Sequence, residues 1–136
     1  MIMKTLPLLA LNLCFTVLSF AQQGTLEVNV KKINTLDGII YVAVYTEDNF
    51  LMQPILSSNT KMLDKTATAI FKNLDFGTYA IAAYQDVNAN DKLDRDEYGR
   101  PTEPWVLSGS QASMMPNWID SKIEFKSEGQ KMDLEL

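Results

Sequence analysis

An all-β fold is predicted by this sequence, namely an antiparallel β-sandwich of the immunoglobulin-like or transthyretin-like kind with one long acidic loop. Apolar and polar residues alternate in several short segments, which is typical of strands with one buried face. Short turn-forming pairs such as Asp37-Gly38 separate these segments, and no segment carries the apolar stripe of an amphipathic helix. Two packed sheets are the usual way for such strands to bury their apolar faces.

The individual strands differ in how they are expected to be buried. Leu26, Val28 and Val30 alternate with polar residues, so the first strand should have one face in water. The run after Gly77 is apolar enough for a strand that is covered on both faces. The expected strands cover residues 26–30, 39–45, 66–71, 78–84, 122–125 and 132–136. Helix is expected only as a short turn near residues 48–51.

Composition narrows the possible functions. A chain of 136 residues fits one domain. It contains no histidine, and this removes the commonest general base and the commonest zinc ligand. A formal net charge of −5 argues against nucleic acid as a partner, because such binding needs a clustered basic surface. No serine has an identifiable base to activate it, so we expect no enzymatic activity.

The start of the chain has the features of a secretory signal. Lys4 precedes an apolar run, and Ser19-Phe20-Ala21 offers small residues at a cleavage site. We therefore expect a cleaved signal peptide over residues 1–21, a β-sandwich domain over residues 22–136, and export to the periplasm or the cell surface. The residue before Cys14 is not small, so a lipid anchor is not expected. No later apolar run is long enough for a transmembrane span.

The connection after the fourth expected strand is rich in oxygen-bearing side chains at alternate positions. Calcium prefers six to eight such oxygens, and its common loop of about twelve residues supplies them from alternate positions. Residues 86–97 fit this spacing, so calcium is the expected cofactor. The candidate ligands are Asp86, Asn88, Asn90, Lys92 through its backbone carbonyl, Asp94 and Glu97.

Two departures from that calcium loop leave alternatives open. Asp91 occupies the position where a glycine usually makes the sharp turn, although aspartate tolerates the left-handed conformation better than most residues. Pro101 follows too closely for a second helix, so Asp96 or Glu103 could close the site instead of Glu97. A plain polar turn is the alternative interpretation of the whole segment.

The sequence also resembles a known bacterial family. Gly77-Thr78-Tyr79-Ala80 leads into the Asp/Asn-rich segment, and a Gly-x-Pro-x-Glu-Pro segment ends at Pro104. This arrangement resembles the bacterial domain-of-unknown-function 2141 family, which is similar in outline to the calcium-binding B-type repeats of surface proteins. The resemblance implies an exported β-sandwich and implies no particular biochemical activity. After Pro104 this chain lacks the family's glycine, although Ser108 is kept.

Three functions follow as hypotheses from these features. The first is a calcium-stabilised binding or adhesion module of the cell envelope, whose partner is an envelope protein or a glycan. The second is a carboxylate-based hydrolase acting on envelope glycans, with Glu103 as one of its acids. The third is a purely structural envelope subunit. Trp105 and Trp118 are interpreted as residues that cover one end of the core, with ligand stacking as the alternative.

Overall fold

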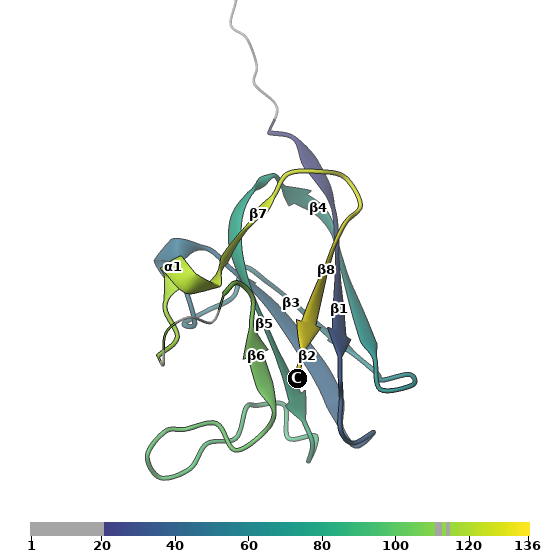
Figure 1. Ribbon diagram of the computed structural model, residues 1–136, viewed down its shortest axis with the longest axis vertical. Coiled ribbons are helices and arrows are strands. Elements are labelled where there is room, and N and C mark those ends of the chain that lie inside the picture. Colours follow the sequence, from purple (N-terminus) through teal and green to yellow (C-terminus); the bar gives the residue numbers. More distant parts are fainter. Residues whose placement is uncertain (1–20, 111–112, 114) are drawn as a thin grey trace, which may run out of the picture.

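The computed structural model describes residues 21–110, 113 and 115–136, which form two β-sheets packed face to face (Figure 1). The expected signal peptide lies outside the described residues except for Ala21. The strands are β1 (Gln23–Lys31), β2 (Ile39–Tyr45), β3 (Leu56–Thr60), β4 (Ala67–Asp75), β5 (Gly77–Asp86), β6 (Trp105–Leu107), β7 (Lys122–Phe125) and β8 (Gln130–Glu135). A 3-10 helix, η1 (Glu47–Asn49), and one helical turn, α1 (Trp118–Ser121), complete the elements. The all-β sandwich is therefore confirmed.

The two sheets differ in size and pairing. The smaller one has the order β4-β1-β8, and the larger one has the order β3-β2-β5-β6, with β7 pairing with β5 as well. β1 and β4 are antiparallel, but β8 runs parallel to β1, so the purely antiparallel arrangement is wrong for this pair. The cause is the last turn, which carries the chain from β7 in one sheet to β8 in the other instead of closing a hairpin.

Period-two alternation puts the core between the sheets. Alternate side chains of a strand point to opposite faces, and the inward ones here are aliphatic. On β1 these are Leu26, Val28 and Val30, and all three are fully buried. Opposite them on β2 lie Ile40, Val42 and Val44, which are equally buried. Phe125 on β7 closes one end of the core against Phe76, with their rings edge to face at 5.1 Å.

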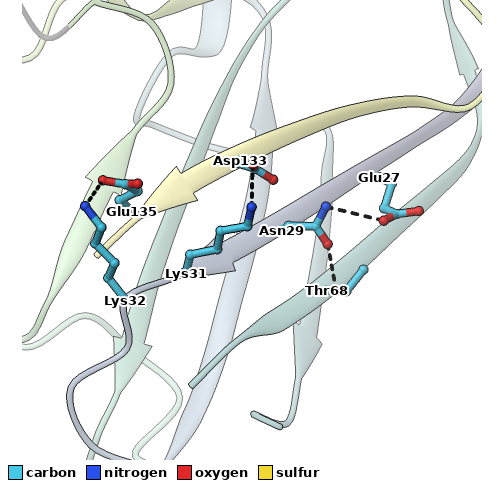
Figure 2. A network of polar contacts seen from close by, with 7 residues as sticks. All are labelled: Glu27, Asn29, Lys31, Lys32, Thr68, Asp133 and Glu135. Carbon is cyan, nitrogen blue, oxygen red and sulfur yellow. Dashed lines mark hydrogen bonds and ion pairs between the residues drawn. The ribbon is translucent and has the colours of Figure 1, made fainter. Parts of the chain in front are cut away.

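The outer face of the smaller sheet is a polar, solvated surface, shown in Figure 2. Ion pairs and hydrogen bonds connect neighbouring strands there, for example Lys31 Nζ to Asp133 Oδ2 at 2.5 Å. The residues drawn in this network are Glu27, Asn29, Lys31, Lys32, Thr68, Asp133 and Glu135. Exposed ion pairs of this kind are screened by water and contribute little to stability, so this face is chiefly adapted to water.

Most strands lie where the alternation placed them, and two lie where it gave no signal. β3 has the sequence Leu-Ser-Ser-Asn-Thr, which is too polar for the pattern, and it forms by pairing with β2. β6 interrupts the long connection after β5 and pairs Trp105 with Tyr84. The short turn expected near residues 48–51 is confirmed as η1. Within the described residues, no helix is long and apolar enough to cross a membrane.

Candidate functional site

The candidate site is built around Asp86, the last residue of β5. Its side chain is completely buried, although ionised carboxylates are seldom buried without partners. Its Oδ1 accepts a hydrogen bond from the backbone N–H of Asn90 at 3.0 Å, and its Oδ2 accepts one from Asp91 at 2.8 Å. The carboxylate thus winds the following residues into a tight loop. Figure 1 shows this connection projecting from the end of the sandwich below β6.

A left-handed backbone at two positions makes the tight winding possible. Ala89 has φ of 55° and Asp91 has φ of 66°, so Asp91 adopts the conformation that a glycine usually supplies. The expected tolerance of aspartate at this position is therefore confirmed. The Asp91 side chain is also held, because its Oδ1 accepts a hydrogen bond from the hydroxyl of Tyr41 at 2.5 Å. This contact fixes the loop to β2.

Three of the predicted ligand side chains converge inside the loop. Asp94 Oδ2 accepts a hydrogen bond from Asn88 Nδ2 at 2.6 Å, and Asp94 Oδ1 accepts one from Asn90 Nδ2 at 2.8 Å. These bonds from Asn90 and Asn88 favour the ionised carboxylate and lower the pKa of Asp94 below its usual value. The loop therefore gathers two amides and one carboxylate at one point, next to buried Asp86.

The remaining candidates, Lys92 and Glu97, form no hydrogen bond with Asp94 in the described part of the chain. Lys92 is exposed, and its backbone N–H donates to Asn90 Oδ1 at 3.2 Å. Glu97 is exposed and forms no hydrogen bond or ion pair with the described part of the chain. Among the described residues, no three acidic, histidine or cysteine side chains form a group able to hold a metal. Any ion here would therefore depend on the asparagine oxygens as well as on carboxylates.

Glu103 is the second buried acid of the site, with only 9% of its surface exposed. Its Oε1 accepts from the backbone N–H of Val87 at 2.9 Å, and its Oε2 accepts from that of Asp94 at 3.0 Å. Glu103 thus connects the start of the loop to its end. The spacing of the sequence indicated Glu103 only as one alternative for closing a metal site. Its burial could have been inferred only from its place between Pro101 and Pro104, in the segment before β6.

Asp96 organises the turn that follows the loop. Its Oδ1 accepts from the backbone N–H groups of Tyr98 and Arg100, both at 2.9 Å, and its Oδ2 forms an ion pair with the Arg100 guanidinium at 2.7 Å. The bond from the Arg100 backbone is the largest influence that lowers the pKa of Asp96. Both oxygens of Asp96 are therefore occupied by its own turn.

A groove of about 550 Å³ lies beside this loop on the outer face of the larger sheet. Ala43 of β2 and Ala82 of β5 form its floor, and Tyr45, Tyr84 and Trp105 stand around them. Trp105 is 38% exposed, so the interpretation of this residue as a cover of the core is wrong. Trp118 is half-buried and packs edge to face on Phe50, with ring centroids 5.9 Å apart.

Tyr84 connects the groove to the loop. Its ring stacks on that of Tyr41, with centroids 5.1 Å apart and planes 8° from parallel. The pKa of Tyr84 is raised to about 12, and burial is the largest cause. Electrostatic repulsion, first from Tyr41 and then from Asp86, raises this pKa further. The stacked rings therefore connect the groove, which Tyr84 lines, to Tyr41, whose hydroxyl donates a hydrogen bond to Asp91.

Fold and site together define a β-sandwich with a loop at one end that the Asp86 carboxylate winds. Residues 28–133, well over half of the chain, match the family described as "Uncharacterized protein conserved in bacteria (DUF2141)". The chain belongs to this family, which confirms the resemblance seen in the sequence. Comparisons with curated proteins and with solved structures found no match.

Proposed function

We propose that this protein is an exported, calcium-stabilised binding module of the bacterial cell envelope. The observation that carries the calcium part is the convergence of Asn88 and Asn90 on Asp94, whose carboxylate oxygens lie 2.6 and 2.8 Å from the two amide nitrogens. The binding part is supported by the apolar groove that lies directly beside this loop. Export is supported by the signal-like residues at the start of the sequence.

The donor set suits a hard cation once the two amides are turned. Rotation of an asparagine amide by 180° exchanges its nitrogen and oxygen without moving the rest of the side chain. Asn88 and Asn90 would then direct their oxygens to the point where their Nδ2 atoms now contact Asp94. The turned amides would give up the long contacts that their oxygens now accept from the backbone N–H groups of Asn90 and Lys92, at 3.3 and 3.2 Å. Asp86 keeps free lone pairs beside its two backbone bonds, because each carboxylate oxygen can accept more than one contact.

Glu97 is the best candidate for the closing ligand. Asp96 and Glu103, the two alternatives, each use both carboxylate oxygens in hydrogen bonds to the backbone or in an ion pair. Glu97 keeps its carboxylate free of such bonds within the described part of the chain. A site with two neutral amides and few charges should bind calcium only modestly, with a Kd of about 10⁻⁴–10⁻³ M as in extracellular modules.

Calorimetric titration with calcium tests the proposed metal site. The unchanged protein should bind one equivalent, and Asp94→Ala should abolish binding because it removes the carboxylate at the centre of the donors. Asp48→Ala is the matched control, since Asp48 is an exposed acid of η1, outside the loop. Equal binding by the unchanged protein and Asp94→Ala, or no heat from either, would refute the calcium site.

A further inference from the structure

We propose that the groove on the outer face of the larger sheet binds a small amphipathic anion, a molecule with an apolar body and one carboxylate group. This inference deepens the proposed binding function and rests on it, because it names the ligand chemistry that the module would take. The shape, the apolar lining and the charge of the groove support this ligand.

The shape of the groove follows from the residues on neighbouring strands. Ala43 and Ala82 face each other across β2 and β5, and their small side chains leave the sheet open. Tyr45 and Tyr84 each follow one of these alanines by two residues, so they point to the same face and form walls. Trp105 pairs with Tyr84 from β6 and extends the wall. The volume of about 550 Å³ lies within the usual range of about 300–1,000 Å³ for small-molecule sites.

The apolar lining contrasts with the other outer face of the sandwich. There most solvent-facing positions carry charged, amide or hydroxyl side chains that form ion pairs and hydrogen bonds (Figure 2), and Ile70 is the exposed apolar exception on β4. At the groove, Trp105 remains 38% exposed, and Tyr98 and Met115 are each about three-quarters exposed. Contiguous exposed apolar surface of this kind is typical of binding sites rather than of faces adapted to water. An apolar ligand body would cover these side chains.

The charge of the groove selects an anion. Among the described residues that line it, Arg95 and Arg100 are the only charged ones, although the whole chain has a net charge of −5. Arg100 is already paired with Asp96 and lies over the Tyr98 ring at 5.2 Å. Arg95 donates one bond to the Gly99 carbonyl at 2.8 Å and has no acidic partner in the described part of the chain. Its remaining donors match the fork geometry of a carboxylate.

A titration with decanoate and with decanol separates charge recognition from simple apolar contact. The protein is produced from the full chain, and binding is followed by calorimetry and by tryptophan fluorescence, since Trp105 lines the groove. We expect decanoate to bind at least about tenfold more tightly than decanol, because a bidentate charge-assisted contact has roughly that effect. Arg95→Gln should remove this preference, and Ala43→Phe should abolish the binding of both molecules.

A control variant and parallel titrations with and without calcium separate loss of ligand binding in the groove from other effects. Lys72→Gln removes one exposed cation from β4, away from the groove, and should leave both affinities unchanged. Equal affinity for decanoate and decanol, loss of the preference in Lys72→Gln, or unchanged binding by Ala43→Phe would each overturn the proposal. All titrations are repeated with calcium and with a chelator. Decanoate binding that is equal in calcium and in chelator would support the groove, and the calcium titration of the loop then decides the calcium site separately.

Discussion

Replacing Glu103 by glutamine is the most informative single change at the loop. The two side chains have nearly the same shape, but one carboxylate oxygen becomes an NH₂ group that cannot accept a hydrogen bond. In the structure both oxygens accept from the backbone, from Val87 at 2.9 Å and from Asp94 at 3.0 Å. Glu103→Gln therefore leaves one of these N–H groups facing a donor in a site that is only 9% exposed.

The size of the effect follows from the lost bond. A hydrogen bond to a charged group contributes about 1.5–3 kcal/mol, and a stranded buried donor adds to the cost, so we expect a loss of about 3 kcal/mol. For a domain of this size that corresponds to a fall in Tm of roughly 10 °C. Urea unfolding measures the free energy, and hydrogen exchange at the amides of Val87 and Asp94 localises it.

Glu97→Gln provides the matched control for this experiment. Glu97 has the same chemistry but is exposed and forms no hydrogen bond within the described chain, so its replacement should change stability by less than about 0.5 kcal/mol in the absence of calcium. Equal effects of the two substitutions, or unchanged amide protection at Val87 and Asp94 in Glu103→Gln, would refute the role assigned to Glu103.

Three further predictions concern residues in or next to the strands of the larger sheet. Gly38→Ala should destabilise the protein by more than about 3 kcal/mol in urea unfolding, since φ there is 79° and an added Cβ would lie 1.8 Å from the Asp86 carbonyl oxygen. Ser108→Ala should cost about 2 kcal/mol by the same assay, because the buried hydroxyl accepts from the Ile81 N–H at 2.8 Å and donates to the Ser121 carbonyl at 2.6 Å. Ultraviolet titration should find that Tyr84 ionises only near pH 12. Stability should accordingly fall between about pH 10 and 12, where tyrosine in the unfolded chain has lost its proton and Tyr84 in the folded chain has not.

The predictable part of the fold is the part in which burial alternates along the chain. The β1 and β2 strands have aliphatic residues at every second position, and these residues are the ones buried between the sheets. β3 could not be recognised in this way, because its five residues are mostly polar and its pairing with β2 is what makes it a strand. The parallel pairing of β8 with β1 is equally invisible in local sequence, since it depends on a connection that crosses between the sheets.

The loop was predictable in composition and only in part in geometry. The alternate spacing of oxygen-bearing residues predicted that Asn88, Asn90 and Asp94 would lie close together, and the hydrogen bonds from both amides to Asp94 show that they do. The same spacing could not distinguish Glu97 from Glu103, because what buries Glu103 is the return of the chain to the sheet at β6. The groove was also beyond the sequence, because Ala43 and Ala82 become neighbours only through the register of β2 with β5.

A thermal melt in chelator, in calcium and in magnesium tests the central claim that a calcium ion stabilises this loop. If calcium is present at about a hundredfold above its Kd, linkage gives about 2.7 kcal/mol of stabilisation, or a rise in Tm of roughly 10 °C. We predict this rise with calcium, a much smaller one with magnesium, and none in Asp94→Ala. An equal Tm in all three solutions would contradict the claim and leave the segment as a polar turn held by Asp86 and Glu103.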